Sequence, residues 1–196
     1  MYGGNIDFYD IKGVADALLK TIRIYDCDYV RTSDSDAFDE ASAFHPGRSA
    51  VILKDGKAIG ILGEIHPDVA ENYGIEVKVY AAKLNVPEML KLSEKDVTYK
   101  PMPKFPATTR DLSLICDDNL PAASIEKAIK KAAGKVLEKV TLFDVYKGKQ
   151  IEEGKKSISY SISMRSHDGT LTDEQADSVM KKVLKALKDI GADLRM

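Results

Sequence analysis

In the second half of the chain, apolar positions switch between the two-residue period of strands and the 3.6-residue period of helices. The switches predict a strand, a helix, two strands, a helix and a short final strand. The first five of these elements are expected at residues 109–116, 121–134, 136–146, 156–165 and 172–191. This βαββαβ order predicts a ferredoxin-like sheet with both helices packed on one face.

The first half is predicted to be a separate antiparallel α+β module. Asp10 is expected to cap its first helix. The apolar face of that helix comprises Ile11, Val14, Ala15, Leu18, Leu19 and Ile22. Two β-rich runs within residues 48–65 flank Asp55-Gly56, a dipeptide typical of tight hairpin turns. The remaining predicted elements are strands at 24–31 and 77–84 and short helices that open at Pro67 and Pro87.

A proline-containing stretch separates two predicted domains, residues 1–92 and residues 105–196. Residues 93–104 have little apolar periodicity, which indicates a linker. The chain of 196 residues has a net charge of −2, but this value is an average over unlike halves. Before Phe105, 13 basic and 17 acidic side chains give −4, whereas 16 basic and 14 acidic side chains after it give +2. The second domain is therefore the one better suited to RNA.

Strand parity in the second domain predicts an uncovered polar face of the sheet. Apolar residues of the strand at 156–165 must face the helices, which leaves an outward row of Ser157, Ser159, Ser161, Ser163 and Arg165. On the preceding strand, Phe143 and Val145 are expected inward, and Leu142, Asp144 and Tyr146 outward. A ring can stack on a base, and carboxylate and hydroxyl groups can bond its edge. The same pattern also fits an ordinary solvated face, and the lysines of both helices are expected to be solvated.

No self-contained active site is predicted from the motifs of the chain. The stretch at residues 148–157 departs from a phosphate-binding loop in its spacing, and no GxGxxG, HExxH or GxSxG motif occurs. The histidines of the chain are His45, His66 and His167. A metal site built from them would need a further ligand that the sequence does not identify. Cys27 and Cys116 are too few and too far apart for a disulfide framework. Without a secretory signal or a long apolar run, the expected location is the cytoplasm.

Seven segments, spread from about Asn5 to the end, closely resemble one family. They are FYDIKGVADALL, FHPGRSAVI, IGILGEIHP, FPATTRDLSL, LFDVYKG, KKSISYSISMRS and GTLTDEQADSVMKKVLKAL. In this order they are similar to the C-terminal part of the β subunit of bacterial phenylalanyl-tRNA synthetase. The resemblance implies that residues 1–92 end a catalytic-like module, similar in fold to a class II synthetase core but without its active site.

For residues 105–196 the resemblance implies the ferredoxin-fold domain that binds the tRNA anticodon. Asp144 and Tyr146 match family positions that contact the first anticodon base, with Tyr146 stacking and Asp144 accepting hydrogen bonds from guanine. Arg110 and Asp111 match an Arg-Asp pair that either positions the strand or touches RNA, with the first role preferred. The strand parity adds Ser157, Ser159, Ser161, Ser163 and Arg165 as candidates.

The resemblance further implies a noncatalytic, excised piece of a longer subunit. In the family, the β subunit packs on a catalytic α subunit in an α2β2 ligase that joins phenylalanine to its tRNA. ATP and Mg²⁺ then serve the holoenzyme and are not expected on this chain. His45, Arg48, Glu64 and His66 are expected to be architectural. Two alternatives stay open: a stand-alone ferredoxin-like module that binds RNA or a small ligand, and a structural piece without RNA affinity of its own.

Overall fold

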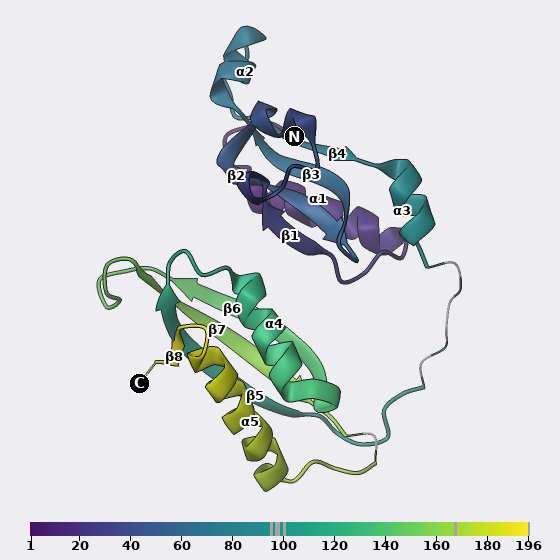
Figure 1. The fold of residues 1–196 in the computed structure, drawn as a ribbon, viewed down its shortest axis with the longest axis vertical. Helices are drawn as coiled ribbons and strands as arrows, with labels where there is room; N and C mark the ends of the chain where they lie inside the picture. The colour runs from purple at the N-terminus through teal and green to yellow at the C-terminus, as the bar shows by residue number, and fades with distance from the viewer. Residues whose placement is uncertain (95, 97–98, 100, 167, 196) are drawn as a thin grey trace. The chain divides into compact units, whose positions relative to one another are not determined.

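A computed structural model describes residues 1–94, 96, 99, 101–166 and 168–195 of the chain. The chain forms two compact units, residues 1–99 and residues 100–196, each with its own sheet and core (Figure 1). The division falls within the stretch expected to be a linker. Part of that stretch, like His167, lies outside the described residues.

The first unit is built on a four-stranded antiparallel sheet. Its strands, in their order across the sheet, are β1 (Asp28–Arg31), β2 (Phe44–Lys54), β3 (Lys57–Ile65) and β4 (Tyr80–Leu84). Strands β2 and β3 form the predicted hairpin, and its turn residues Asp55 and Gly56 have φ angles of 50° and 76°. Both lie in the left-handed region that such a turn requires. The strand predicted at 24–31 starts only at Asp28, because Asp26 has a positive φ of 51° that interrupts extended backbone.

Helix α1 (Phe8–Thr21) packs on one face of this sheet. The helix begins before the predicted cap: Asp7 is the N-cap residue, and Asp10 closes a capping box with it. The buried stripe is also narrower than predicted, since Val14 and Leu18 are 54% and 43% exposed. Two short helices, α2 (Pro67–Asn72) and α3 (Val86–Leu92), and two 3₁₀ turns, Thr32–Asp34 and Asp39–Ala43, complete the unit.

The second unit has the predicted ferredoxin-like topology. Its elements in chain order are β5 (Thr108–Asp117), α4 (Ala122–Ala133), a 3₁₀ turn (Gly134–Val136), β6 (Leu137–Tyr146), β7 (Lys155–Met164), α5 (Asp173–Lys188) and β8 (Ala192–Leu194). The antiparallel sheet has the order β6-β7-β5-β8. Helices α4 and α5 lie side by side on one face of this sheet (Figure 1).

The core of the second unit lies between that face and the two helices. Ile125 and Ile129 of α4 and Val183 and Leu187 of α5 are fully buried. They meet the inward side chains of β5 and β7, including Leu114, Ile158 and Tyr160. Because both helices occupy the same side, the outward row of β7 faces away from this core.

Strand β6 departs from the predicted alternation at a β-bulge. The register shifts between Leu142 and Asp144, so Phe143 is an extra residue without a partner on β7. Leu142 lies opposite Tyr160, which faces the helices, so the prediction that Leu142 points outward was wrong. Phe143, expected inward, is 56% exposed. After the bulge, Asp144 and Tyr146 lie opposite Ser159 and Ser157, in the outward row as predicted.

Candidate nucleic-acid interface

The pairing register orders the uncovered face of the second sheet into rows. One row pairs Tyr146 with Ser157, and the next pairs Asp144 with Ser159. Ser159 is paired in turn with Ser113 of β5, and the two hydroxyl oxygens are 2.9 Å apart. The register therefore brings the ring, the carboxylate and hydroxyl groups onto one face.

This face has a buried floor and an exposed rim. Ser157 and Ser159 lie on the inner strand β7 and are only 1% and 5% exposed. Asp144 is exposed and Tyr146 is 38% exposed, both on the edge strand β6. A molecule approaching this face would meet the ring and the carboxylate before it met the serine hydroxyls.

Asp111 and Ser161 form a further row of the same face. The two residues are paired across β5 and β7. Asp111 is exposed, whereas Ser161 is half-buried. Asp111 and Ser161 thus share the face with Asp144 and Tyr146. Their row lies next to the row of Ser159 and Asp144.

Arg110, by contrast, does not belong to the uncovered face. It has the parity of Leu112 and Leu114, which point to the helices. Its Nη2 lies 2.6 Å from Oδ1 of Asp173 and 3.6 Å from Oδ1 of Asp177, both on α5. Arg110 therefore joins a strand to the helix that covers it, which agrees with the positioning role preferred for it.

Arg165 lies at the end of β7 with its guanidinium occupied. Its Nε donates to Oε1 of Glu138 at 2.9 Å and its Nη2 to Oε2 at 3.1 Å, while Nη1 donates to the carbonyl oxygen of Phe105. Ser163 also donates to Glu138, at 3.1 Å. These contacts hold the start of the domain and the end of β7 against β6.

Arg195 is a basic residue of this face that the sequence patterns did not single out. Its backbone N–H donates to the carbonyl oxygen of Ser113 at 2.8 Å, which extends the pairing of β8 with β5. Its Nη1 lies 3.3 Å from Oγ of Ser157 and its Nη2 3.4 Å from Oε1 of Gln150. The signal was available in principle, because Arg195 follows a predicted strand with the parity of the outward residues.

The loop between β6 and β7 is attached to the loop after β5. Lys147 forms an ion pair with Asp118, and this contact holds the pKa of the Asp118 carboxyl below its usual range. The Asp118 N–H donates to the carbonyl oxygen of Gly154 at 2.8 Å. Lys156 donates to the carbonyl oxygens of Asp118 and Leu120 at 2.8 and 2.7 Å. The end of β6 that carries Tyr146 therefore leads into a loop held at several points.

In the first unit, the motif residues form a structural cluster. Nη2 of Arg48 donates to Oε1 of Glu64 at 2.8 Å, and the Tyr80 hydroxyl donates to Oε2 of the same carboxylate at 3.0 Å. Glu64 is 3% exposed, and its hydrogen bond with Arg48 is the main reason that its pKa is lowered. Burial raises the pKa of Tyr80, and the bond to Glu64 adds to this.

Both histidines of that unit make local backbone contacts. Nδ1 of His45 accepts from the Gly47 N–H at 3.0 Å, and Nδ1 of His66 accepts from the Asp68 N–H at 3.3 Å at the start of α2. The described residues bring together no group of three or more His, Cys, Asp or Glu side chains that could hold a metal ion. Because Glu64 and Arg48 neutralise each other, they do not fit a site for Mg²⁺ or for ATP phosphates.

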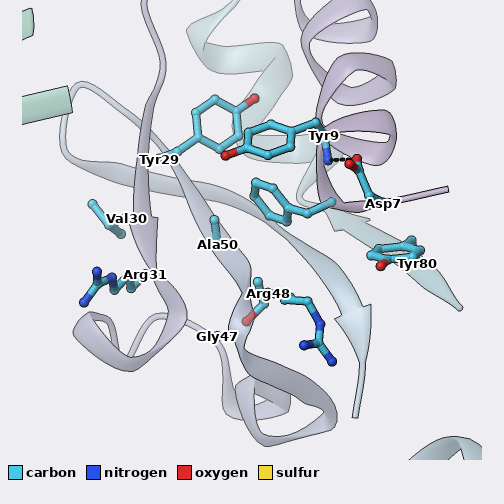
Figure 2. A pocket seen from close by; sticks show the side chains of 11 residues that line it. Asp7, Tyr9, Tyr29, Val30, Arg31, Gly47, Arg48, Ala50 and Tyr80 are labelled. Carbon is cyan, nitrogen blue, oxygen red and sulfur yellow. Dashed lines mark hydrogen bonds between the residues drawn. The ribbon is translucent and has the colours of Figure 1, made fainter. Parts of the chain in front are cut away.

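An open pocket of ≈ 510 Å³ lies beside the start of α1, over β1 and β2. Figure 2 shows Tyr9 and Tyr29 toward one end of the pocket and Arg48 toward the other. Three of its polar side chains already have partners: Asp7 caps α1, the Tyr29 hydroxyl donates to Asp16, and Arg48 is bound to Glu64. Arg31 also lines the pocket. What the pocket offers is mainly aromatic surface, which suits an apolar segment better than a charged ligand.

The second unit belongs to the class of ferredoxin-like domains with both helices on one face of the sheet, and the comparison with known families makes this assignment more specific. Residues 103–195 match the family described as ferredoxin-fold anticodon binding domain. Residues 2–86 match the family described as phenylalanyl tRNA synthetase beta chain CLM domain. The chain belongs to the phenylalanyl-tRNA synthetase β subunit family and corresponds to its C-terminal part.

Curated relatives extend the match over both units. The phenylalanine–tRNA ligase β subunit of Clostridium acetobutylicum is 41% identical over 196 residues, 100% of this chain and 24% of that protein. The β subunit of Clostridium tetani is 43% identical over the same shares. That of Bacillus subtilis is 36% identical over 185 residues, 94% of this chain and 22% of that protein. The chain thus spans about a quarter of the length of these relatives.

Proposed function

We propose that the uncovered face of the second unit receives the anticodon of phenylalanine tRNA. Tyr146 stacks on the first anticodon base, and Asp144 accepts hydrogen bonds from it. The observation that carries the proposal is the shared face of these two side chains, on neighbouring rows of an edge strand and beside hydroxyl groups. The match of residues 103–195 to an anticodon-binding family supports it.

The chemistry of the two side chains is suited to guanine. Alternate residues of one strand are about 7 Å apart, so a base on the Tyr146 ring can reach Asp144 with its edge. The Watson–Crick edge of guanine presents N1–H and an exocyclic amino group, both of which are donors. A carboxylate accepts both, while adenine and the pyrimidines lack this pair of adjacent donors. The modest +2 charge after residue 104 favours base recognition over a broad phosphate-binding surface.

We further propose that the chain is a noncatalytic part of a cytoplasmic phenylalanine–tRNA ligase. Its first unit packs on the catalytic α subunit of an α2β2 assembly, and that subunit uses ATP and Mg²⁺. The pocket between α1 and β2 supports a packing role, since aromatic side chains line it and its Asp7 and Arg48 are engaged within the unit. No helix among the described residues is long and apolar enough to cross a membrane. The relatives, which match both units, favour this assignment over a stand-alone ferredoxin-like module.

The anticodon proposal is tested by titrating the chain with phenylalanine tRNA and with an anticodon-swapped control. Tyr146→Ala should weaken binding of phenylalanine tRNA by about 5- to 150-fold, because a stacked aromatic contributes about 1–3 kcal/mol per base. Tyr73→Ala, which removes a ring that is 79% exposed on the first unit, is the matched control and should leave binding unchanged. Equal affinity for both tRNAs, together with no effect of Tyr146→Ala, would overturn the proposal.

A further inference from the structure

Gly148 lies directly against the ring of Tyr146, two residues earlier in the chain. A β-carbon at Gly148 would be 2.3 Å from the phenolic oxygen, 2.5 Å from Cζ and 3.1 Å from Cε2 of Tyr146. All three separations are well inside van der Waals contact, so any side chain at this position requires the ring or the loop to move. Gly148 does not have a positive φ, so its backbone conformation alone does not require glycine.

The loop around Gly148 is held more firmly than the ring. Its neighbour Lys147 is paired with Asp118, and the Gly148 carbonyl oxygen accepts from the Ile151 N–H at 2.9 Å. Gln150 contacts Arg195. The Tyr146 ring rests against Gly148, but it is 38% exposed, so a side chain added at position 148 would push it toward solvent more easily than it would move the loop. A methyl group at position 148 would therefore displace the ring.

We propose that Gly148 is a positioning residue for base recognition, because its bare α-carbon fixes the orientation of the Tyr146 ring before RNA binds. This inference rests on the proposed stacking role of Tyr146. Fixing an aromatic ring in advance removes the entropic cost of ordering it on binding. Glycine is thus required at position 148, after β6, because a side chain there would displace the Tyr146 ring from the recognition face.

The contact itself is tested by NMR on the chain without RNA. The Gly148 α-protons should show nuclear Overhauser contacts to the ring protons of Tyr146 and an upfield ring-current shift. Tyr146→Ala should abolish both signals. Absence of the contacts in the unsubstituted chain would overturn the inference, whatever RNA binding shows.

The functional part is tested by a double-mutant cycle with an anticodon stem-loop of phenylalanine tRNA. Gly148→Ala should weaken binding about 2- to 10-fold when Tyr146 is present, the range expected for losing one pre-ordered side chain. In the Tyr146→Ala background the same substitution should have no effect. Gly169→Ala is the matched control, because a β-carbon there meets no atom within 4 Å.

The outcomes separate this inference from the proposed function. If Tyr146→Ala itself leaves binding unchanged, both the stacking role and the role of Gly148 are wrong. If Tyr146→Ala weakens binding but Gly148→Ala does not, only the inference about Gly148 fails. It also fails if Gly148→Ala weakens binding equally in both backgrounds, because the effect would then not pass through the ring.

Discussion

Single residues explain why the most distinctive motifs of the first unit are architectural. Gly63 has a φ of 149°, and a β-carbon there would be 2.4 Å from the Arg48 carbonyl oxygen and 2.5 Å from the Ser49 α-carbon. The register of β2 and β3 is irregular between Phe44 and Ser49, so the two backbones approach closely at this point. Next to it, Glu64 binds Arg48. The segments FHPGRSAVI and IGILGEIHP are therefore held together by a close backbone approach at Gly63 and by the hydrogen bond between Arg48 and Glu64.

Glu64 gives this cluster a predicted pH dependence. Its pKa in the folded chain is lowered, chiefly by the hydrogen bond from Arg48. A lowered folded pKa means that the contribution of Glu64 to stability is complete above its unfolded value of about 4.3 and is lost as the pH falls below it. Glu64→Gln should destabilise the first unit by about 1.5–3 kcal/mol at neutral pH, the range for hydrogen bonds to charged groups.

Denaturant unfolding followed by NMR signals of the first unit measures this effect at pH 7 and pH 3. The difference between Glu64→Gln and the unsubstituted chain should shrink at pH 3, because this pH lies below the unfolded pKa of Glu64 and folding must then remove the proton from the carboxyl to form the ion pair. Glu71→Gln, an exposed change on α2, is the matched control. A difference that stays constant between the two pH values would contradict the role assigned to the charged pair.

At the scale of elements, periodicity predicts the strands and helices well because each buries one face. The order of the second unit follows from that pattern alone, and the outward serines of β7 were placed by parity. The β6 bulge could not be read in the same way, since Leu142 and Phe143 are both apolar and either could have faced inward. The start of α1 was misplaced because Asp7 and Asp10 are both suitable caps, and the capping box uses both.

For Arg110, the strand alternation in the sequence already indicated the correct side of the sheet. The alternation that places Leu112 and Leu114 inward also places Arg110 on their side. Arg110 was nevertheless included among the candidate RNA-binding residues, because it matches the Arg-Asp pair of the family. The pairing with Asp173 depends on how α5 crosses β5, a long-range contact that no local pattern reports.

A substitution of Arg110 distinguishes a link between elements from an RNA contact. Arg110→Met removes the ion pairs of β5 with α5 and should lower the free energy of unfolding only slightly, as for other solvent-exposed pairs. Affinity for phenylalanine tRNA, measured in parallel, should not change. A selective loss of affinity for phenylalanine tRNA over the anticodon-swapped control would contradict the placement of Arg110 outside the interface.

At the scale of the whole molecule, the chain joins two units with different folds and opposite net charges. The residues before Phe105 carry a net charge of −4 and those from Phe105 onward +2. The two family matches, residues 2–86 and 103–195, fall in the first and the second unit. The fold of each unit follows from its periodicity. The proposed site was found in part, because parity identifies the outward strand residues. Arg195 was missed although strand parity could have placed it outward, and Gly148 was missed because its contact with Tyr146 arises only in the folded chain.

The central claim is that Asp144 reads the donors of guanine at the first anticodon position. The most direct test compares stem-loops that carry guanine or inosine there, because inosine lacks only the exocyclic amino group. The unsubstituted chain should bind the inosine form about tenfold or more weakly, as expected for one hydrogen bond to a charged acceptor. Asp144→Ala should bind both forms equally. Equal binding of the two stem-loops by the unsubstituted chain, or full discrimination by Asp144→Ala, would contradict the account.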